Sequence, residues 1–231
     1  MAGKWTIWTC THQLTQFFRI ARKEVEPLVP PALVPHLLVD KDGFGSFEVG
    51  FSHFPSGTQA LPATNELSVA IQLKAEARLR FGVFALNIAA DNQEYLDHTL
   101  RLDRYRVHLP PVRFSLDLDR REIVVHDHLD NPIVLLRHHT KGSIPLPFLP
   151  LVTETWSQLP QEALQRRLFK WRGPALLHRS PFVASSLLPH PFFRGLDVSR
   201  ADPMSIEVFA SHPYAAGCAQ LLTSPENRTP K

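Results

Sequence analysis

The chain has 231 residues, of which 44% are hydrophobic and 20% charged, and its formal net charge is +3. This composition is typical of a globular protein, and no run approaches the roughly 18 apolar residues of a membrane-spanning helix. The small basic excess lies in isolated pairs such as Arg120-Arg121, not in a basic stripe, so we expect no nucleic-acid partner and no membrane span. We predict one domain over residues 1–223 and a disordered polar tail over 224–231.

The amino terminus lacks the apolar h-region of a signal peptide, which favours a cytoplasmic location. Cys10 and Cys218 are the two cysteines, too few for a disulfide framework, and we expect both to be reduced thiols.

Strands are predicted where apolar residues alternate or where β-branched and aromatic residues gather. In chain order they lie within 6–20 (one or two strands), 44–54, 66–75, 79–90, 104–109, 112–118, 122–128, 132–139, 167–178 (one or two strands) and 203–211. Helical turns are predicted at 21–28, at 92–102 with Asp91 as the N-cap, and at 160–168. Twenty-one prolines favour short elements with stiff connectors at 28–38, 142–150 and 180–194. The predicted fold class is therefore α+β, mainly antiparallel sheet with few helices.

Familiar catalytic motifs are missing from the sequence. It contains no G-x-G-x-x-G, Walker A, G-x-S-x-G or C-x-x-C, which argues against a dinucleotide-dependent dehydrogenase, a P-loop NTPase or an α/β-hydrolase. Two histidine pairs, His126 with His128 and His138 with His139, could supply metal ligands across a hairpin, but they also fit the solvated face of a strand meander. We predict no metal and no cofactor.

Two acids interrupt otherwise apolar strands. Glu48 alternates with Phe47 and Val49 and so points to the opposite face, while Glu66 opens the next strand. A carboxyl group that faces a mostly apolar pocket has a raised pKa and can act as a general acid or base. Alternatively, each is an ordinary solvent-facing glutamate.

The order of features over residues 15–210 resembles the acetoacetate decarboxylase-like superfamily. The stretch LVPPALVPHLLVDKDGFGSFEVGFSHF is similar to the family's Val-Pro connector, which leads to a strand after Asp-Gly. Glu66 lies where the family has a glutamate, and RLRFGVFALNIAADN resembles its strand that ends in Asp-Asn. Tyr105 occupies the place of an aromatic residue before the family's Pro-Lys-Lys. The resemblance implies a cone-shaped, mainly antiparallel β-barrel around a small-molecule pocket.

The same resemblance also identifies what this chain lacks. In the decarboxylases a lysine after that aromatic residue forms a Schiff base with a β-keto acid, but here Arg106, Val107 and His108 follow Tyr105. Arginine stays protonated and is not a nucleophile. The family's Gly-Arg-Glu reads Thr99-Leu100-Arg101, and no lysine lies between Lys74 and Lys141. Schiff-base decarboxylation is therefore not expected.

The predicted strand over 104–109 has two different faces. Arg104, Arg106 and His108 share one face, which could bind an anion and shuttle a proton, and Tyr105 and Val107 share the other. The family alignment favours the second face as the pocket lining, whereas the charged face could equally be a solvated edge. The predicted substrate-binding residues are Tyr105, Val107, Arg104 and Phe84, and the predicted catalytic residues are Glu66, Glu48, His108 and Arg106.

These features lead to the hypothesis of an enzyme that acts on a keto- or carboxyl-bearing small molecule by acid–base chemistry without a Schiff-base lysine. The alternative is a non-catalytic binding module for a hydrophobic small molecule. A third hypothesis is a decarboxylase with a displaced lysine, for which Lys74 is the candidate. The proline-rich apolar stretches 142–150 and 189–193 also suggest a homo-oligomer.

Overall fold

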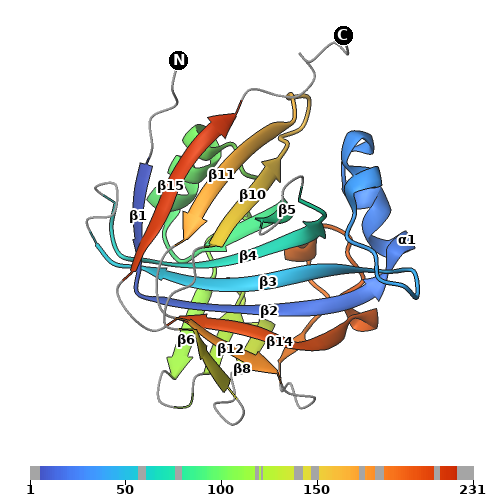
Figure 1. The fold of residues 1–231 in the computed structure, drawn as a ribbon. Coiled ribbons are helices and arrows are strands. Elements are labelled where there is room, and N and C mark those ends of the chain that lie inside the picture. Colours follow the sequence, from blue (N-terminus) through green and yellow to red (C-terminus); the bar gives the residue numbers. More distant parts are fainter. Residues whose placement is uncertain are drawn as a thin grey trace.

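The computed structural model describes residues 6–56, 61–75, 80–117, 120, 122–137, 143–146, 151–171, 175–179, 185–210 and 214–222. The predicted tail therefore lies outside the described residues. Within them, the fold is sheet-rich with few helices, as the sequence predicts (Figure 1). No helix in this part of the chain is long and apolar enough to cross a membrane.

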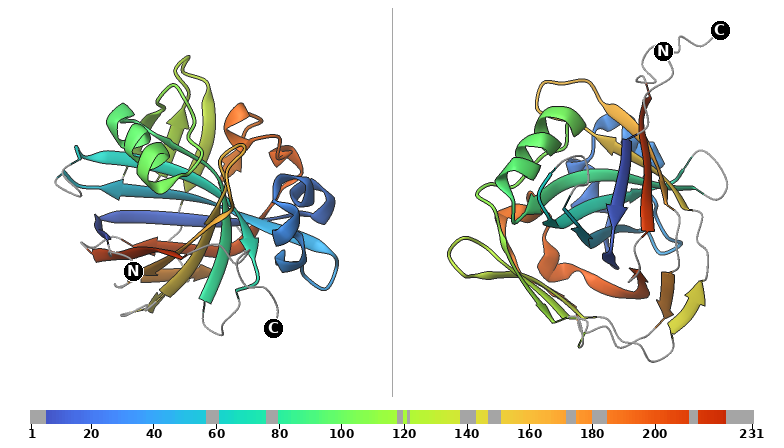
Figure 2. Two further views of the ribbon diagram at one scale, coloured as in Figure 1. Left: turned by 90° about the horizontal axis from the view of Figure 1, so that it is seen from above. Right: turned by 90° about the vertical axis from the view of Figure 1, so that its left-hand side faces the viewer.

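Most strands belong to one long sheet, which twists and curves strongly (Figure 2). Its strand order is β1-β15-β11-β10-β5-β4-β3-β2-β14-β12-β9. Its members are β1 (Thr6–Cys10), β2 (His12–Ala21), β3 (Phe44–Phe54), β4 (Thr64–Leu73), β5 (Arg80–Ala90), β9 (Ser143–Leu146), β10 (Leu151–Ser157), β11 (Gln165–Trp171), β12 (Ala175–Arg179), β14 (Asp202–Ala210) and β15 (Tyr214–Leu222).

Pairing in the long sheet is mainly antiparallel, and β5 with β10 is the parallel pair among the described strands. The strand order leaves β1 and β9 as edges, so the described residues form an open sheet. The closed, cone-shaped barrel implied by the resemblance is not found among them.

A second sheet has the order β13-β8-β7-β6. Its strands are β6 (Arg113–Asp117), β7 (Glu122–His126), β8 (Pro132–Arg137) and β13 (Ser186–Leu187). The first three form the meander that the sequence predicts.

The helical elements are short. Among the described residues they comprise α1 (Arg22–Val25), α2 (Gln93–His98), four 3-10 turns at Glu26–Leu28, Pro31–His36, Pro191–Phe193 and Val198–Arg200, and a π-helical turn at Thr99–Asp103. The π-helical turn continues α2 directly, so the predicted helix over 92–102 is present but changes its winding halfway.

The larger core lies on one face of the long sheet. Phe47, Val49 and Phe51 of β3 alternate onto this face and are at most 1% exposed, as their period of two predicts. The second sheet covers them, with Phe114 of β6 against Phe51 at a ring separation of 5.8 Å. We call this side of β2–β5 the core face.

The opposite side of β2–β5, which we call the polar face, carries Glu48, Glu66 and a series of small or polar residues. These other members include Thr15, Ser46, Gly50, Ser52, Ser68, Ala70 and Gln72, and the larger Phe17 of β2 lies directly opposite Glu48 on the same face. At the Glu66 end, this face meets a smaller apolar cluster that contains Cys10, Phe54, Ile88, Ala90, Tyr95, Leu96 and Tyr105. Cys10 is a buried free thiol, and its burial raises its pKa to about 12.

Two predicted elements are wrong. The helix expected at 160–168 is a turn followed by β11, because Gln161 adopts a φ of 64° that ends any helical path. The strand expected at 104–109 has only an isolated parallel bridge between Val107 and Ile88 of β5. Arg104, with a φ of 58°, is the left-handed cap of the π-helical turn and ends it abruptly.

One of the two apolar stretches that suggested a homo-oligomer does not expose its aromatic side chains. Phe192 and Phe193 are both 0% exposed within the larger core, so 189–193 does not present its aromatic rings to solvent. The side chains of 142–150 lie outside the described residues.

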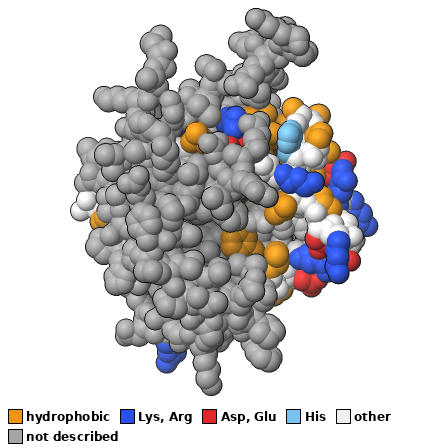
Figure 3. Space-filling view, in the orientation of Figure 1, with side chains coloured by type: hydrophobic (Ala, Val, Ile, Leu, Met, Phe, Trp, Pro, Cys, Tyr) orange, Lys and Arg blue, Asp and Glu red, His pale blue; other side chains and the backbone are white. Residues whose placement is uncertain are grey.

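Charged side chains of both signs intermingle at the surface near α1 (Figure 3). Arg22 and Glu26, for example, form an exposed ion pair within this region. The mixture agrees with the mixed charge of the sequence and shows no basic stripe on the described part of this face.

Candidate functional site

Glu66 lies at one end of the polar face, opposite Ser52 of β3 and Ala90 of β5. Its side chain is half-buried, and the hydroxyl of Tyr95 donates a hydrogen bond to its Oε2 at 2.5 Å. Burial raises the pKa of Glu66 to about 7, although the Tyr95 hydrogen bond acts in the opposite direction. A carboxyl group with this pKa can give or take a proton near neutrality.

Helix α2 places the Tyr95 hydroxyl. Asn92 is its N-cap, because the Asn92 side chain accepts a hydrogen bond from the Tyr95 backbone N–H at 3.1 Å. Asp91, the predicted cap, instead binds the backbone and side-chain nitrogens of Asn65 on β4. The cap fixes the first turn of the helix, so Tyr95 and Leu96 enter the smaller cluster.

The π-helical turn brings a second acid into the same region. Its last residue, Asp103, forms a buried ion pair with Arg167 of β11. Burial raises the pKa of Asp103 although Arg167 lowers it, and the negative charge of Asp103 in turn contributes to the raised pKa of Glu66. Single π turns inside helices occur frequently at functional sites.

Tyr105 and Val107 lie at the smaller apolar cluster, which also contains Tyr95. The bridge to Ile88 is flanked by two backbone hydrogen bonds, Ile88 N–H to Arg106 at 3.0 Å and His108 N–H to Ile88 at 2.7 Å. Val107 consequently shares the side of Ile88 and packs against the smaller cluster, and Tyr105 belongs to that cluster. The guanidinium of Arg167 lies 5.6 Å from the centre of the Tyr105 ring.

Arg104, Arg106 and His108 each contact a partner other than Glu66. Arg104 pairs with Glu162, and Arg106 donates from Nε to the Gln158 carbonyl at 2.9 Å. His108 packs edge-on against His190 at 5.2 Å. Burial lowers the pKa of His108, and the neighbouring histidines lower it further.

Glu48 lies on the polar face but is not adjacent to Glu66. It faces Ala70 of β4, four residues beyond the Glu66–Ser52 pair, which corresponds to roughly 13 Å along the sheet. Burial raises the pKa of Glu48 to about 7, and Gln72 is its hydrogen-bond partner at 3.5 Å. The two glutamates therefore cannot act on the same atom of a small substrate.

Sequence reasoning misplaced one residue and missed three. Phe84 lies on the core face, 3% exposed, and is separated from both glutamates by the sheet. Tyr95, Asp103 and Arg167 were not expected in the site. Tyr95 could not be singled out because in the sequence it belongs to an ordinary apolar stripe of a helix. Arg167 could not be singled out because only the register of β11 brings it to Asp103.

The lysines whose side chains are described, Lys23, Lys41 and Lys74, are all exposed. In the same part of the chain, no group of three or more His, Cys, Asp or Glu side chains is arranged to hold a metal ion. His138 and His139 lie outside it.

The matches to known proteins come from the comparison of three-dimensional structures. No protein-family model matches the sequence. No curated protein matches it either. Among solved structures, acetoacetate decarboxylase from Legionella pneumophila is similar with a TM-score of 0.66 and 12% identity, over 97% of this chain and 89% of that one.

Two further structures are similar. An acetoacetate decarboxylase-like enzyme from Sphingomonas wittichii has a TM-score of 0.54 and 15% identity, over 96% of this chain and 94% of that one. The enduracididine biosynthesis enzyme MppR, in complex with pyruvate, has a TM-score of 0.60 and 11% identity, over 96% and 91%. The chain therefore has the fold of the acetoacetate decarboxylase-like superfamily, as the resemblance in its sequence predicts.

Proposed function

We propose that this chain is an acetoacetate decarboxylase-like enzyme that acts on a keto- or carboxyl-bearing small molecule by acid–base chemistry. Glu66 is the general base or acid, and no Schiff base forms. The observation that carries this proposal is the half-buried Glu66 carboxyl group, with a pKa of about 7, hydrogen-bonded to Tyr95 beside the Asp103–Arg167 pair.

The chemistry follows from the side chains. Ionised Glu66 removes a proton from the carbon next to the substrate's keto group, so that the C–H bond breaks and an O–H bond forms on Glu66. The electron pair moves to the keto oxygen and gives an enolate, and return of the proton to carbon completes the exchange. Val107 stands at the position where the family resemblance expects the Schiff-base lysine, so the carbonyl group remains intact throughout.

Proton exchange on a keto acid tests this proposal directly. Pyruvate is the first probe because MppR has been solved with it, and acetoacetate and longer 2-oxo acids complete the panel. In heavy water, the wild-type protein should replace the protons beside the keto group by deuterium, measured by proton NMR. The rate should rise with pH through about 7 as Glu66 ionises.

Glu66→Gln should reduce exchange by roughly 10²- to 10⁴-fold, the usual contribution of a positioned acid or base. Glu94→Gln is the matched control, because Glu94 is an exposed glutamate of α2 and should leave the rate unchanged. Borohydride treatment with each probe should leave every lysine unmodified. Binding without exchange across the panel would favour the binding module, and a trapped lysine would restore Schiff-base chemistry.

A further inference from the structure

Strand β6 forms an edge of the second sheet. It pairs with β7 on one side, and no other described strand pairs with its opposite side. Figure 1 shows β6 at the lower margin of the molecule. Arg113, Ser115 and Leu116 are exposed, so solvent reaches the strand along most of its length. An edge strand presents unpaired backbone N–H and C=O groups, to which a further strand can add.

The features that usually protect an edge strand from such pairing are missing in β6. Its sequence, Arg-Phe-Ser-Leu-Asp, contains no proline, and its register with β7 is continuous from Arg113 to Asp117, so no bulge bends it. Within β6 no charged side chain points inward, because Phe114 and Leu116 share the face toward the core. A further strand can therefore lie flat against this edge.

The two charged residues of β6 face no opposite charge in their own sheet. Arg113 lies opposite His126 of β7, and Asp117 lies opposite Glu122. Glu122 in turn pairs with Arg137 of β8. Neither end of β6 thus has a complementary cross-strand partner on the side of β7.

The contacts that these two side chains form lie in exposed turns. Arg113 pairs with Asp130, whose side chain is 73% exposed. The Asp117 carboxylate accepts the backbone N–H of Arg120 at 2.9 Å and lies 3.5 Å from its guanidinium, which is 81% exposed. Exposed ion pairs contribute little to stability, so their replacement by partners on another chain costs little.

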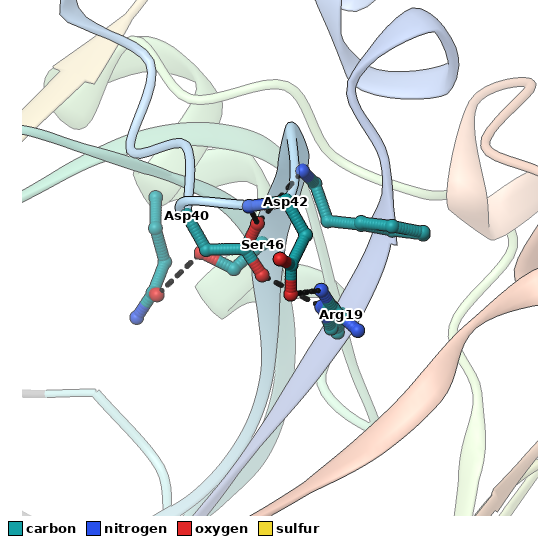
Figure 4. A network of polar contacts seen from close by, with 6 residues as sticks. Arg19, Asp40, Asp42 and Ser46 are labelled. Atoms are coloured by element: carbon teal, nitrogen blue, oxygen red, sulfur yellow. Dashed lines mark hydrogen bonds and ion pairs between the residues drawn. The ribbon is translucent and has the colours of Figure 1, made fainter.

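Arg19 shows how a charged strand residue is held when its partners lie within the chain. Its guanidinium binds the carboxylates of Asp40 at 2.7 Å and Asp42 at 2.8 Å, both in the turn before β3 (Figure 4). Arg113 and Asp117, by contrast, each have one exposed turn residue as ion-pair partner among the described residues. Their charges are therefore the ones more available to a second chain.

The sequence of β6 is complementary to itself when two copies run antiparallel. With Ser115 opposite the second copy's Ser115, Arg113 faces Asp117 at both ends and Phe114 faces Leu116 between them. Opposite charges and apolar pairs directly across an antiparallel pair stabilise it. Leu116, 37% exposed in the single chain, also gains an aromatic neighbour. The same register thus serves the charges, the apolar side chains and the backbone.

We infer that the edge of β6 is a dimerisation surface, at which two copies of this chain pair antiparallel about a two-fold axis through Ser115. The order β13-β8-β7-β6 then continues across the axis with the same four strands in reverse. A two-fold contact of this kind is closed, so it ends at a dimer and does not propagate into a fibre. β6 contains none of the candidate site residues, so the pairing is independent of the proposed function.

Charge reversal tests the pairing, with sedimentation velocity at several protein concentrations as the measurement. The wild type should form a dimer that dissociates on dilution. Arg113→Asp creates two like-charged pairs across the axis, as does Asp117→Arg, so each should weaken dimerisation roughly ten- to a hundredfold. An equimolar mixture of the two variants should form dimers again, because every charged pair across the axis is then opposite in sign.

Asp130→Asn and Arg120→Gln are the matched controls. They remove the turn partners of Arg113 and Asp117 but leave β6 unchanged, so both should dimerise at least as tightly as the wild type. The mixture also reveals any failure to fold, since two misfolded variants would not restore each other's dimer.

Ser115→Cys tests the position of the axis. Directly opposite residues of an antiparallel pair have Cα atoms about 4.5–5.5 Å apart, within the range that a disulfide spans. With glutathione disulfide as the oxidant, the two introduced thiols should be oxidised to one disulfide between the chains, while the oxidant is reduced to two glutathione molecules. Non-reducing electrophoresis detects the covalent dimer.

Arg120→Cys, in the turn after β6, should cross-link far less than Ser115→Cys, because the two copies of that turn lie at opposite ends of the paired strands. Three results overturn the inference: a wild type that stays monomeric at every concentration, a dimer that both charge reversals leave unchanged, or equal cross-linking of the two cysteine variants.

Discussion

At the scale of single residues, the pKa of Glu66 reflects two opposing effects. Burial raises it, and the hydrogen bond from Tyr95 lowers it, with a result of about 7. The sequence could identify Glu66 as an acid in an apolar strand, because that pattern is local. It could not identify Tyr95 and Asp103, which act on Glu66, or Arg167, which pairs with Asp103, because these residues come from three other elements and are brought together only by tertiary packing.

Tyr95→Phe should therefore raise the pKa of Glu66 above about 7. The hydroxyl stabilises the ionised carboxylate, and loss of a hydrogen bond to a charged group corresponds to roughly one to two pKa units. Carbon-13 NMR titration of side-chain carboxyl carbons, assigned with Glu66→Gln, measures the shift. Glu48 is the internal control, because it lies far from Tyr95 and should keep its value of about 7. An unchanged or lowered Glu66 pKa would show that the hydroxyl has no such role.

At the scale of elements, the sequence correctly predicted strands in which apolar and polar residues alternate strictly. It was a poor guide to the segments that connect the elements. The strand at 44–54 was predicted with the bounds that β3 has, since its apolar period of two reflects burial on one face. Residues 104–109 also alternate, yet the segment only touches β5 at one bridge, because Arg104 first has to terminate the π-helical turn. The alternation within 104–109 still correctly predicted that Tyr105 and Val107 share one side of the segment. β15 was missed because alanine and glycine make up nearly half of it and Tyr214 is its one strongly strand-favouring residue.

Asn92→Ala tests how strongly the first turn of α2 fixes the position of Tyr95 in the candidate site. Removing the cap should lower the free energy of unfolding by about 1 kcal/mol, measured by urea denaturation, and should also slow keto-acid exchange by loosening Tyr95. Asn92→Ser and Asn92→Asp keep an oxygen acceptor and should restore most of both quantities. If Asn92→Ala and Asn92→Ser behave alike, the cap hydrogen bond does not stabilise the helix.

At the scale of the whole molecule, order and spacing along the chain predicted the fold although identity to the similar structures is only 11–15%. Burial positions survive substitution because many apolar residues fill the same core, whereas a catalytic lysine has no chemical substitute. The two candidate acids of this chain lie on the polar face of the curved sheet. That face carries two half-buried carboxyl groups with pKa values of about 7, and folding must accommodate both.

The pH dependence of stability follows from these two groups. The folded-state pKa of Glu48 and of Glu66 lies above the ordinary glutamate value of 4.5, so each contributes stability that is fully present below pH 4.5 and is lost as the pH rises through about 7. The loss is at most about 3 kcal/mol for each carboxyl group. His12 and His108 act in the opposite direction, because burial lowers their pKa values and their contribution grows as the pH rises. The wild-type curve alone therefore mixes both effects.

A comparison of variants separates them, since the histidines are common to both proteins. The double variant Glu48→Gln/Glu66→Gln stays neutral at every pH, so its free energy of unfolding relative to wild type should increase steadily between pH 4.5 and pH 8. Each single variant should show about half of that increase, because the carboxyl groups are roughly 13 Å apart and their effects should add. Urea denaturation at several pH values measures the difference. A difference that does not change with pH would show that both carboxyl groups ionise as freely in the folded protein as in the unfolded chain, and the acid–base role of Glu66 would lose its physical basis.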